Sequence, residues 1–292
     1  MPYWFAGLAA VVGVLIGGWG TDVGAKVKQR LGEPVCRKFE HRFWRGCRRA
    51  PPGLVIGSVS QPMINPADGM EYMIFLPTSW KATGSHPVML FLHGVGGINN
   101  AQGCRNPGFT TQFPMLNESY AGAIEHIVIV PIAQQKNWKN HAESCMALID
   151  MVIADLAGDP KRVAVVGQSM GGHGAWLLGS SYPDRFCAVV PMCGYWDGRD
   201  GDDVPPELVA PLASKPIWAF HSEEDEALVP IEETDTVVKA LEEAGNTAVK
   251  YTRYPLGVVP EAKIPGHYAF ALAFAEAHDD GGLWSWLNAQ TL

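Results

Sequence analysis

The sequence predicts an α/β fold in which a mostly parallel sheet of about eight strands carries helices on both faces. The first observation behind this prediction is that short apolar runs alternate with amphipathic stretches from residue 54 onward. The second is that the later runs, HIVIV, RVAVV and PIWAF, are continuously apolar and do not alternate. Parallel strands covered on both faces have this composition. In such folds, ligands bind at the carboxyl ends of the strands.

The strands and helices are predicted from these runs and from the amphipathic stretches between them. The strands cover residues 54–60, 71–76, 88–92, 126–130, 162–166, 187–191, 216–220 and 248–254. The helices cover residues 143–156, 171–181, 231–244 and 268–289. With 292 residues, of which 47% are hydrophobic and 18% charged, the chain can bury a full core. We therefore expect one catalytic-sized domain over residues 53–292.

The N-terminal part differs in composition from this domain. Residues 1–25 form an apolar segment in which residues 2–20 carry no charged side chain, and residues 26–52 form a basic linker. A helix over the uncharged run covers roughly 30 Å at about 1.5 Å per residue, enough to cross a bilayer core. The basic linker then favours a membrane anchor with the domain on the cytoplasmic side. The alternatives are a cleaved signal peptide, with VGA at 23–25 as the cutting site and export as the consequence, or a buried core helix.

Net charge and cysteine spacing exclude some classes of function. A formal net charge of −8 argues against non-specific nucleic-acid binding, so no nucleic-acid partner is expected. The 6 cysteines allow up to three disulfides whose pairing cannot be deduced, and they show no CxxC pair or metal-ligand spacing. Cys187 and Cys193 flank an apolar run and are expected to be buried thiols. The other cysteines are Cys36, Cys47, Cys104 and Cys145.

The stretch GQSMG at 167–171 is a G-x-S-x-G motif between a predicted strand and a predicted helix. This strand-turn-helix context is the one in which the motif marks a nucleophilic serine, here Ser169. The glycines permit a turn that is too tight for side chains on either side of the serine. A phosphate-binding loop is disfavoured because neither G-x-x-x-x-G-K-[ST] nor G-x-G-x-x-G is present here, and a purely structural turn is the remaining alternative.

A nucleophilic serine requires a base and an acid further along the chain, in the order serine, acid, histidine. Asp225 follows the strand PIWAF at a distance that lets it reach a histidine on the next loop. His221 precedes this acidic loop, which leaves His267 and His278 as bases, and His267 is favoured because it lies in a turn ahead of the last helix. The neighbouring acids Glu223, Glu224 and Glu226 are expected to be solvated and not to form a metal site.

The loop FLHGVGG at 91–97 follows the third strand and is expected to complete an oxyanion hole. One N–H donor is expected from Met170, the residue after the nucleophile. The second is expected from Val95 or from Gly94. His93 is interpreted as a residue that shapes this loop and not as a proton carrier.

Four ordered segments resemble the α/β-hydrolase superfamily, in particular its single-domain esterases, which are often called predicted peptidases or phospholipase/carboxylesterases and are related to feruloyl esterases. They are LHGVGG, the stretch from VAVVGQSMGGHG to VVPMCG, KPIWAFHSEEDEALVP, and GHYAF followed by LWSWLNAQ, and the resemblance spans roughly residues 54–290. It implies Ser169 as nucleophile, Asp225 as acid and His267 as base. Trp138 matches a tryptophan that follows the fourth strand near the family's pocket, with a place in the core as the alternative. Gln168 is the second candidate pocket residue.

Two features depart from the family pattern: Ser222 stands where the family usually has glycine, and a longer spacer, residues 256–266, precedes His267. The expected reaction is hydrolysis of a small-molecule carboxylic ester through an acyl-enzyme intermediate, which requires no cofactor. The same triad could serve a peptidase or a thioesterase. The remaining alternative is a catalytically silent, membrane-anchored binding module.

Overall fold

The computed structural model describes residues 50–104, 122–196, 203–259, 266–278 and 281–292. The chain divides into two units, Met1–Phe39 and Glu40–Leu292, and the described residues all belong to the second. The predicted apolar segment over residues 1–25 and most of the basic linker lie outside the described residues. Among the residues that are described, no helix has both the length and the apolar character needed to span a membrane.

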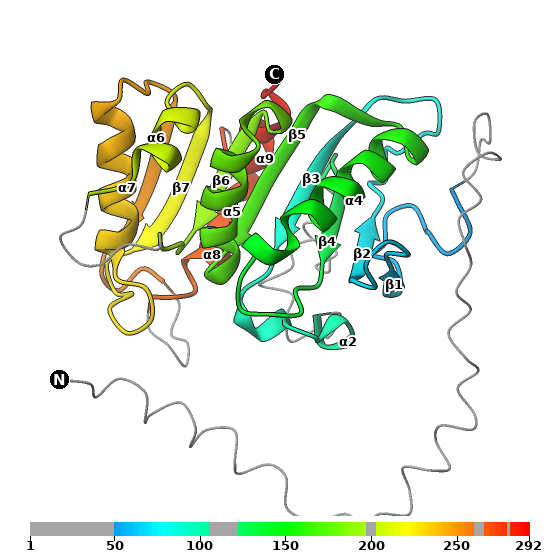
Figure 1. The fold of residues 1–292 in the computed structure, drawn as a ribbon, viewed down its shortest axis with the longest axis horizontal. Helices are drawn as coiled ribbons and strands as arrows, with labels where there is room; N and C mark the ends of the chain where they lie inside the picture. The colour runs from blue at the N-terminus through cyan, green and yellow to red at the C-terminus, as the bar shows by residue number, and fades with distance from the viewer. Residues whose placement is uncertain (1–49, 105–121, 197–202, 260–265, 279–280) are drawn as a thin grey trace, which may run out of the picture. The chain divides into compact units, whose positions relative to one another are not determined.

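The sheet has eight strands in the order β1-β2-β4-β3-β5-β6-β7-β8 (Figure 1). The strands from β4 through β3 to β8 are parallel, whereas β1 and β2 run antiparallel at one edge. Their bounds are β1 Met63–Ile64, β2 Glu71–Phe75, β3 His86–Leu92, β4 Ile127–Pro131, β5 Gly158–Gln168, β6 Ala188–Met192, β7 Ile217–Ser222 and β8 Val249–Tyr254. The predicted mostly parallel sheet is therefore confirmed.

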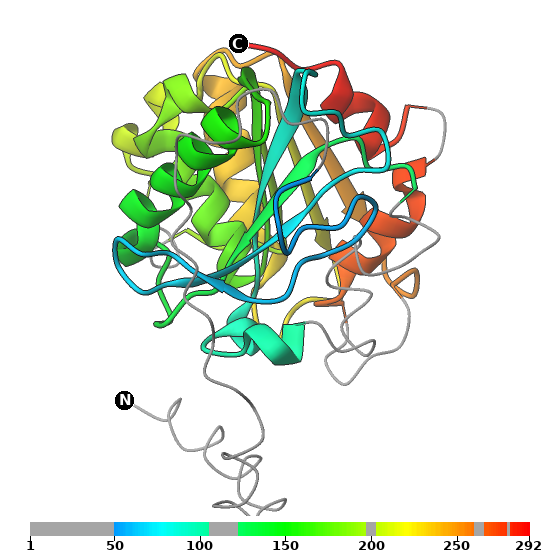
Figure 2. The same cartoon turned by 90° about the vertical axis from the view of Figure 1, so that its right-hand side faces the viewer.

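Helices cover both faces of this sheet, as Figure 2 shows edge-on. One face carries α4 Ala142–Asp155, α5 Met170–Ser181, α6 Pro206–Leu212 and α7 Ile231–Glu243, and the other carries α2 Ala101–Cys104, α8 Ala269–Ala275 and α9 Leu283–Asn288. Successive residues of a strand point to opposite faces. In β3, Val88, Leu90 and Leu92 join the core beneath α4 and α5, whereas Met89 and Phe91 join the core beneath α8.

Two predicted elements differ from the structure. Residues 54–60 form no strand but only two isolated bridges, Ile56 to Leu76 and Val59 to Phe75, because the chain turns at Gly57 with φ +77°. The predicted helix over 268–289 is divided into α8, the short 3₁₀ turn η6 Glu276–His278, and α9. Gly281 lies between them at φ +77°, a conformation that no helix accommodates.

Candidate active site

The parallel strands deliver the candidate residues to one edge of the sheet. Ser169 directly follows β5, Asp225 follows β7, and His267 lies beyond β8. The loop that begins at His93 follows β3, which is the neighbour of β5. Since carboxyl ends of parallel strands meet at the same edge, side chains far apart in the sequence come into contact there.

Ser169 occupies a sharp turn between β5 and α5. Its backbone has φ +56° and ψ −121°, a strained conformation for a residue with a side chain. A Cβ on Gly167 would collide with the backbone of Gly171, and one on Gly171 would collide with the carbonyl oxygen of Leu92. The two glycines of the motif are thus required by close backbone approach, as expected of a strand-turn-helix nucleophile site.

Three side chains form a continuous hydrogen-bonded row at this edge. The Oγ of Ser169 lies 2.9 Å from Nε2 of His267, and Nδ1 of His267 lies 2.6 Å from Oδ2 of Asp225. Because a carboxylate accepts, Nδ1 of His267 carries the proton and Nε2 can accept the serine proton. Asp225 is fully buried, and His267 is 6% exposed. The structure therefore brings together the residues that the sequence predicted as nucleophile, base and acid.

A close backbone contact places His267 beside Asp225. Gly266 has φ +72°, and a Cβ on it would collide with the backbone of Glu224 and Asp225. The long spacer before the histidine thus returns to the acidic loop at this glycine. The alternative base, His278, is the last residue of η6, and its side chain lies outside the described part of the chain.

Asp225 is held as an ionised acceptor. Its Oδ1 accepts the N–H of Val229 at 3.3 Å, while Oδ2 faces His267 and His221. Burial acts to raise the pKa of Asp225, but hydrogen bonds from His221 and His267 and the charges of both histidines hold this pKa below its ordinary value. A carboxylate in this state can stabilise a positive charge that develops on His267.

The loop after β3 wraps around the ring of His93, which is 1% exposed. Nε2 of His93 accepts the N–H of Ala133 at 3.0 Å, so the proton of the neutral ring is on Nδ1, which lies 2.6 Å from the carbonyl oxygen of Gly94. Burial lowers the pKa of His93 to about 4. The hydrogen bond to Gly94 acts to raise this pKa, and the charge of His141 lowers it further. The ring is therefore neutral at neutral pH and fixes the loop, in the role expected from the sequence.

This loop lies against the serine. A Cβ on Gly94 would stand 3.3 Å from the Cβ of Ser169. Val95 begins the 3₁₀ turn η1 Val95–Gly97, and Met170 begins α5, so neither N–H has an acceptor within its own helix. Their arrangement beside Ser169 is compatible with a pair of oxyanion donors.

The two candidate pocket residues are buried. Trp138 has no exposed surface, and its indole N–H donates to the carbonyl oxygen of His93 at 3.3 Å while its ring packs edge-on against the His93 ring. Gln168 is 1% exposed at the end of β5. These positions support the loop and the nucleophile turn, and contact of either side chain with a substrate stays a prediction.

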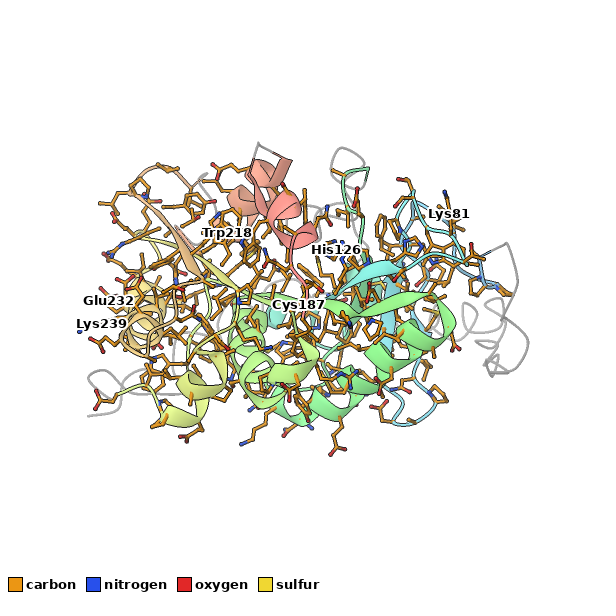
Figure 3. All side chains as sticks on the ribbon, turned by 90° about the horizontal axis from the view of Figure 1, so that it is seen from above. Lys81, His126, Cys187, Trp218, Glu232 and Lys239 are labelled. Atoms are coloured by element: carbon orange, nitrogen blue, oxygen red, sulfur yellow. The ribbon has the colours of Figure 1, made fainter. Side chains whose placement is uncertain are left out.

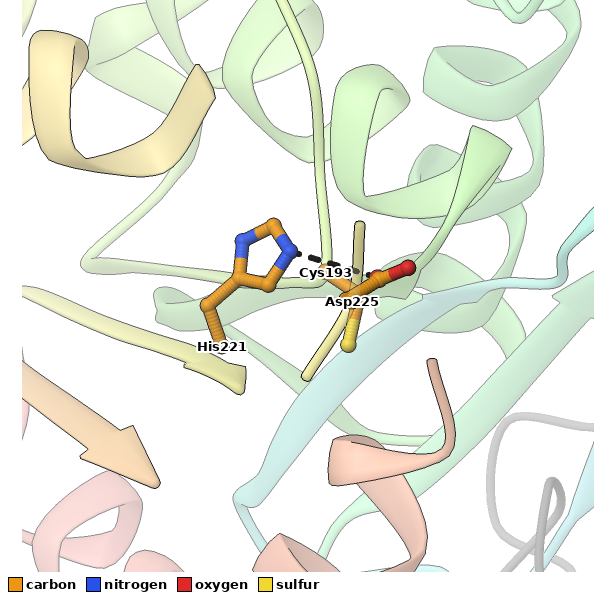
Figure 4. Close-up of side chains that lie close together, drawn as sticks. All are labelled: Cys193, His221 and Asp225. Carbon is orange, nitrogen blue, oxygen red and sulfur yellow. Dashed lines mark hydrogen bonds and ion pairs between the residues drawn. The ribbon is translucent and has the colours of Figure 1, made fainter. Parts of the chain in front are cut away.

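Within the described residues, one group of side chains has the spacing of a metal site: Cys193, His221 and Asp225, whose ligand atoms lie within 4.8 Å of one another (Figure 4). Both ring nitrogens of His221 already have oxygen partners, and Oδ2 of Asp225 accepts from His267. Burial and the charge of Asp225 raise the pKa of the Cys193 thiol, whereas a metal ion requires the thiolate. The chemistry of this group does not fit a metal ion.

All four cysteines among the described residues are buried and unpaired. Cys104, Cys145, Cys187 and Cys193 are free thiols, and burial raises the pKa of each. Cys187 and Cys193 are thus the buried thiols that the sequence predicted. Cys36 and Cys47 lie outside the described residues.

Two buried histidines make the stability of the domain sensitive to acid. His93 has a pKa of about 4, and His126, which precedes β4 (Figure 3), has a pKa lowered to about 3 by burial and by the charge of Arg162. Both histidines take up protons when the domain unfolds in acid. Their contribution to the free energy of unfolding is therefore fully present above about pH 6.5 and is lost as the pH falls toward 4. At about 1.4 kcal/mol per pKa unit, we expect His93 alone to account for roughly 3 kcal/mol, measurable by urea unfolding between pH 7 and pH 4.

His126→Leu provides the control for this prediction. It removes one titrating group at a position that is 2% exposed, so the slope of the unfolding free energy against pH should become shallower below pH 6.5. An unchanged slope in this variant would show that His126 does not contribute.

Comparisons with known proteins identify the family and the fold of the chain. An esterase family, described as "Putative esterase", matches residues 66–257. A search of curated proteins found no match. The chain is similar in structure to a thermostable esterase, with a TM-score of 0.60 and 22% identity over 79% of this chain. It spans 62% of the length of that esterase.

Two further solved structures share the fold. One is esterase 2 of Thermogutta terrifontis phosphoramylated by tabun, with a TM-score of 0.52 and 16% identity over 78% of this chain and 94% of that one. The other is MGS-M1, an α/β-hydrolase from a Medee basin deep-sea metagenome library, with a TM-score of 0.50 and 20% identity over 68% of this chain and 82% of that one. Since the family match covers well over half of the sequence, the chain belongs to this esterase family and has the α/β-hydrolase fold.

Proposed function

We propose that the protein is a serine esterase that cleaves small-molecule carboxylic esters through an acyl-enzyme, with Ser169 as nucleophile, His267 as base and Asp225 as acid. The observation that carries the proposal is the row of hydrogen bonds from Ser169 through His267 to Asp225, 2.9 Å and 2.6 Å long. A row of this order and geometry activates a serine for acyl transfer. No cofactor takes part in this chemistry.

In the first half of the reaction, Oγ of Ser169 attacks the ester carbonyl carbon while Nε2 of His267 takes the hydroxyl proton. Asp225 keeps the proton of His267 on Nδ1 and stabilises the imidazolium that forms. The tetrahedral intermediate then expels the alkoxide, which leaves as the alcohol with the proton from Nε2. The acyl group remains bound to Oγ of Ser169.

In the second half, water replaces the alcohol. Nε2 of His267 takes a proton from the water as its oxygen attacks the acyl carbon, and the collapse of the second intermediate returns that proton to Ser169. The products are the carboxylic acid and the free enzyme. Amides and thioesters would follow the same steps, so the identity of the leaving group must be measured.

Labelling with a fluorophosphonate, followed by a panel of substrates, tests the proposal. We expect covalent labelling at Ser169, competition by aryl esters, and faster turnover of aryl esters than of the matched anilides and thioesters with the same acyl group. A panel of increasing acyl length then separates a short-chain esterase from a lipase. A folded protein that takes no label would instead be a silent hydrolase fold, and preference for the anilide would make it a peptidase.

The proposed oxyanion hole consists of the N–H groups of Met170 and Val95. Val95→Pro deletes the second donor, and the backbone is prepared for it: Val95 is the first residue of a 3₁₀ turn, and the preceding Gly94 is extended at φ −75° and ψ −176°. We expect kcat for an aryl ester to fall about 10²-fold to 10³-fold, the loss typical of one missing donor. Steady-state kinetics measure it.

Val95→Ala is the matched control because it shortens a side chain that is 57% exposed and keeps the N–H. Its kcat should stay within about twofold of the wild type, as for ordinary surface substitutions. If kcat fell equally in the proline and alanine variants, the N–H of residue 95 would not be the second oxyanion donor.

We further propose that residues 2–20 anchor the enzyme to a membrane, supported by the uncharged run and the basic residues that follow it. The full chain should then fractionate with membranes and resist extraction by salt or carbonate. Deletion of residues 1–50 should release an active hydrolase into the soluble fraction. N-terminal sequencing of the protein isolated from cells tests the alternative, since a mature start at Lys26 would identify a cleaved signal peptide.

A further inference from the structure

A second histidine, His221, also bonds to Asp225. It is the penultimate residue of β7, is fully buried, and directs Nε2 toward Oδ2 of Asp225 at 3.3 Å (Figure 4). Oδ2 of Asp225 is the same oxygen that accepts from Nδ1 of His267. The carboxylate that is proposed to orient the base is therefore shared between two imidazoles.

The partners of His221 determine where its proton lies. Nε2 faces only acceptors, the carboxylate of Asp225 and the carbonyl oxygen of Val229 at 2.9 Å, so Nε2 carries a hydrogen. Nδ1 lies 2.7 Å from the hydroxyl of Thr234 on α7. In this arrangement His221 donates to Asp225 and to Val229 together, and thereby closes the turn that begins at the acid.

The contacts of His221 continue to the nucleophile turn. The hydroxyl of Thr234 also lies 3.1 Å from the carbonyl oxygen of Gly194, which follows β6. Gly194 packs so closely on Gly172 of α5 that a Cβ on either residue would stand only 2.7 Å from the backbone of the other. The chain of contacts thus runs from α5 through Gly194, Thr234 and His221 back to Asp225.

These contacts form a closed ring with the proposed triad. Asp225 bonds to His267, His267 bonds to Ser169, and Ser169 directly precedes α5, on which Gly194 packs. Every member of the ring except the serine hydroxyl and the exposed edge of His267 is buried. A carboxylate in a small loop has several orientations available, and a buried, directional donor removes most of them.

We propose that His221 is a positioning residue of this active site, which fixes the carboxylate of Asp225 for His267 by donating Nε2–H to Oδ2 while Thr234 holds the opposite nitrogen. This role rests on the proposed function, because His221 can act on catalysis only if Asp225 is the acid of the triad. A histidine that merely fills space in the core would contribute to stability but would not act through the acid.

Two substitutions separate the two ring nitrogens. His221→Asn places an amide near the Nδ1 position, where it can still bond to Thr234, and loses the donor to Asp225. His221→Gln places an amide nitrogen near Nε2, where it can donate to Asp225 and Val229. We expect kcat for an aryl ester to fall about 10-fold to 100-fold in the asparagine variant, with KM within about twofold, and most of kcat to return in the glutamine variant.

The decisive measurement is a double-mutant cycle with Asp225→Asn. If His221 acts through the acid, His221→Asn should cost less than about threefold in the Asp225→Asn background, because the partner that it positions has already lost its charge. The second-order rate of fluorophosphonate labelling at Ser169 provides the readout for the slow variants. An equal cost in both backgrounds would overturn the proposal and identify a purely structural residue.

Controls keep failure of this proposal distinct from failure of the triad. Asp225→Asn with wild-type turnover would refute the proposed function itself, whereas an impaired Asp225→Asn beside a fully active His221→Asn would refute only the role of His221. His126→Asn removes another buried histidine and should leave turnover unchanged. If neither His221 variant folds, Thr234→Val tests the same role, because it keeps the imidazole of His221 and removes only the hydroxyl that faces Nδ1. This variant should lower kcat up to about 10-fold when Asp225 is intact, and should have no such effect in the Asp225→Asn background.

Discussion

Ser169→Ala is expected to lower ester hydrolysis by about 10⁴-fold to 10⁶-fold, the scale on which a triad loses rate without its nucleophile. The methyl group of alanine cannot form the acyl-enzyme, and the remaining rate comes from substrate binding and the oxyanion donors. The loss should appear in kcat and in kcat/KM alike. Steady-state kinetics with an aryl ester measure it, and fluorophosphonate labelling should vanish in parallel.

Ser180→Ala is the matched control for this substitution. It removes a hydroxyl from the same helix, α5, where Ser180 donates to the carbonyl oxygen of Leu177 at 3.1 Å. Its turnover should equal that of the wild type, and the thermal unfolding of both alanine variants should remain cooperative. Activity retained in a folded Ser169→Ala protein would remove Ser169 from the mechanism altogether.

The nucleophile turn could be predicted from the sequence because its determinants are local. Gly167 and Gly171 are required by contacts within the turn and with the adjacent strand, so the pattern G-x-S-x-G records the geometry directly. The apolar runs of the central strands are equally informative, since β3, β4, β6 and the part of β5 from Val163 onward are buried on both faces, where continuously apolar runs are expected.

Elements at the margins could not be predicted as well. The run at 54–60 has the composition of a strand, but the turn at Gly57 leaves it with isolated bridges. The last helical pattern covers two helices because Phe274 of α8 and Trp284 of α9 stack with ring centroids 6.0 Å apart across the break. Periodicity records which residues are buried and not where the chain reverses between them.

The supporting contacts of the site are non-local and were missed for that reason. The bonds of His221 to Thr234, and of Thr234 to Gly194, join β7, α7 and the end of β6. The only signal in the sequence was the spacing of four residues between His221 and Asp225 after a buried strand. This spacing becomes informative once the loop from Asp225 to Val229 is known to fold back onto the ring.

His267→Ala is expected to match the loss in Ser169→Ala to within about tenfold, although it leaves the serine hydroxyl in place. Without Nε2, which lies 2.9 Å from Oγ of Ser169, no group takes the proton as the hydroxyl attacks. The variant that lacks both side chains should be little slower than either single variant, because the residues act as one unit. Parallel measurement of kcat/KM for the three proteins tests this non-additivity.

The same experiment decides between the two histidines that the sequence allowed. His278→Ala should retain wild-type turnover, since Nδ1 of His267 already bonds to Oδ2 of Asp225 while its Nε2 faces Oγ of Ser169. An inactive His278→Ala variant together with an active His267→Ala variant would identify His278 as the base. The spacer at residues 256–266 would then not position a catalytic residue. Losses that multiply in the double variant would mean that Ser169 and His267 contribute independently, which a shared proton transfer does not permit.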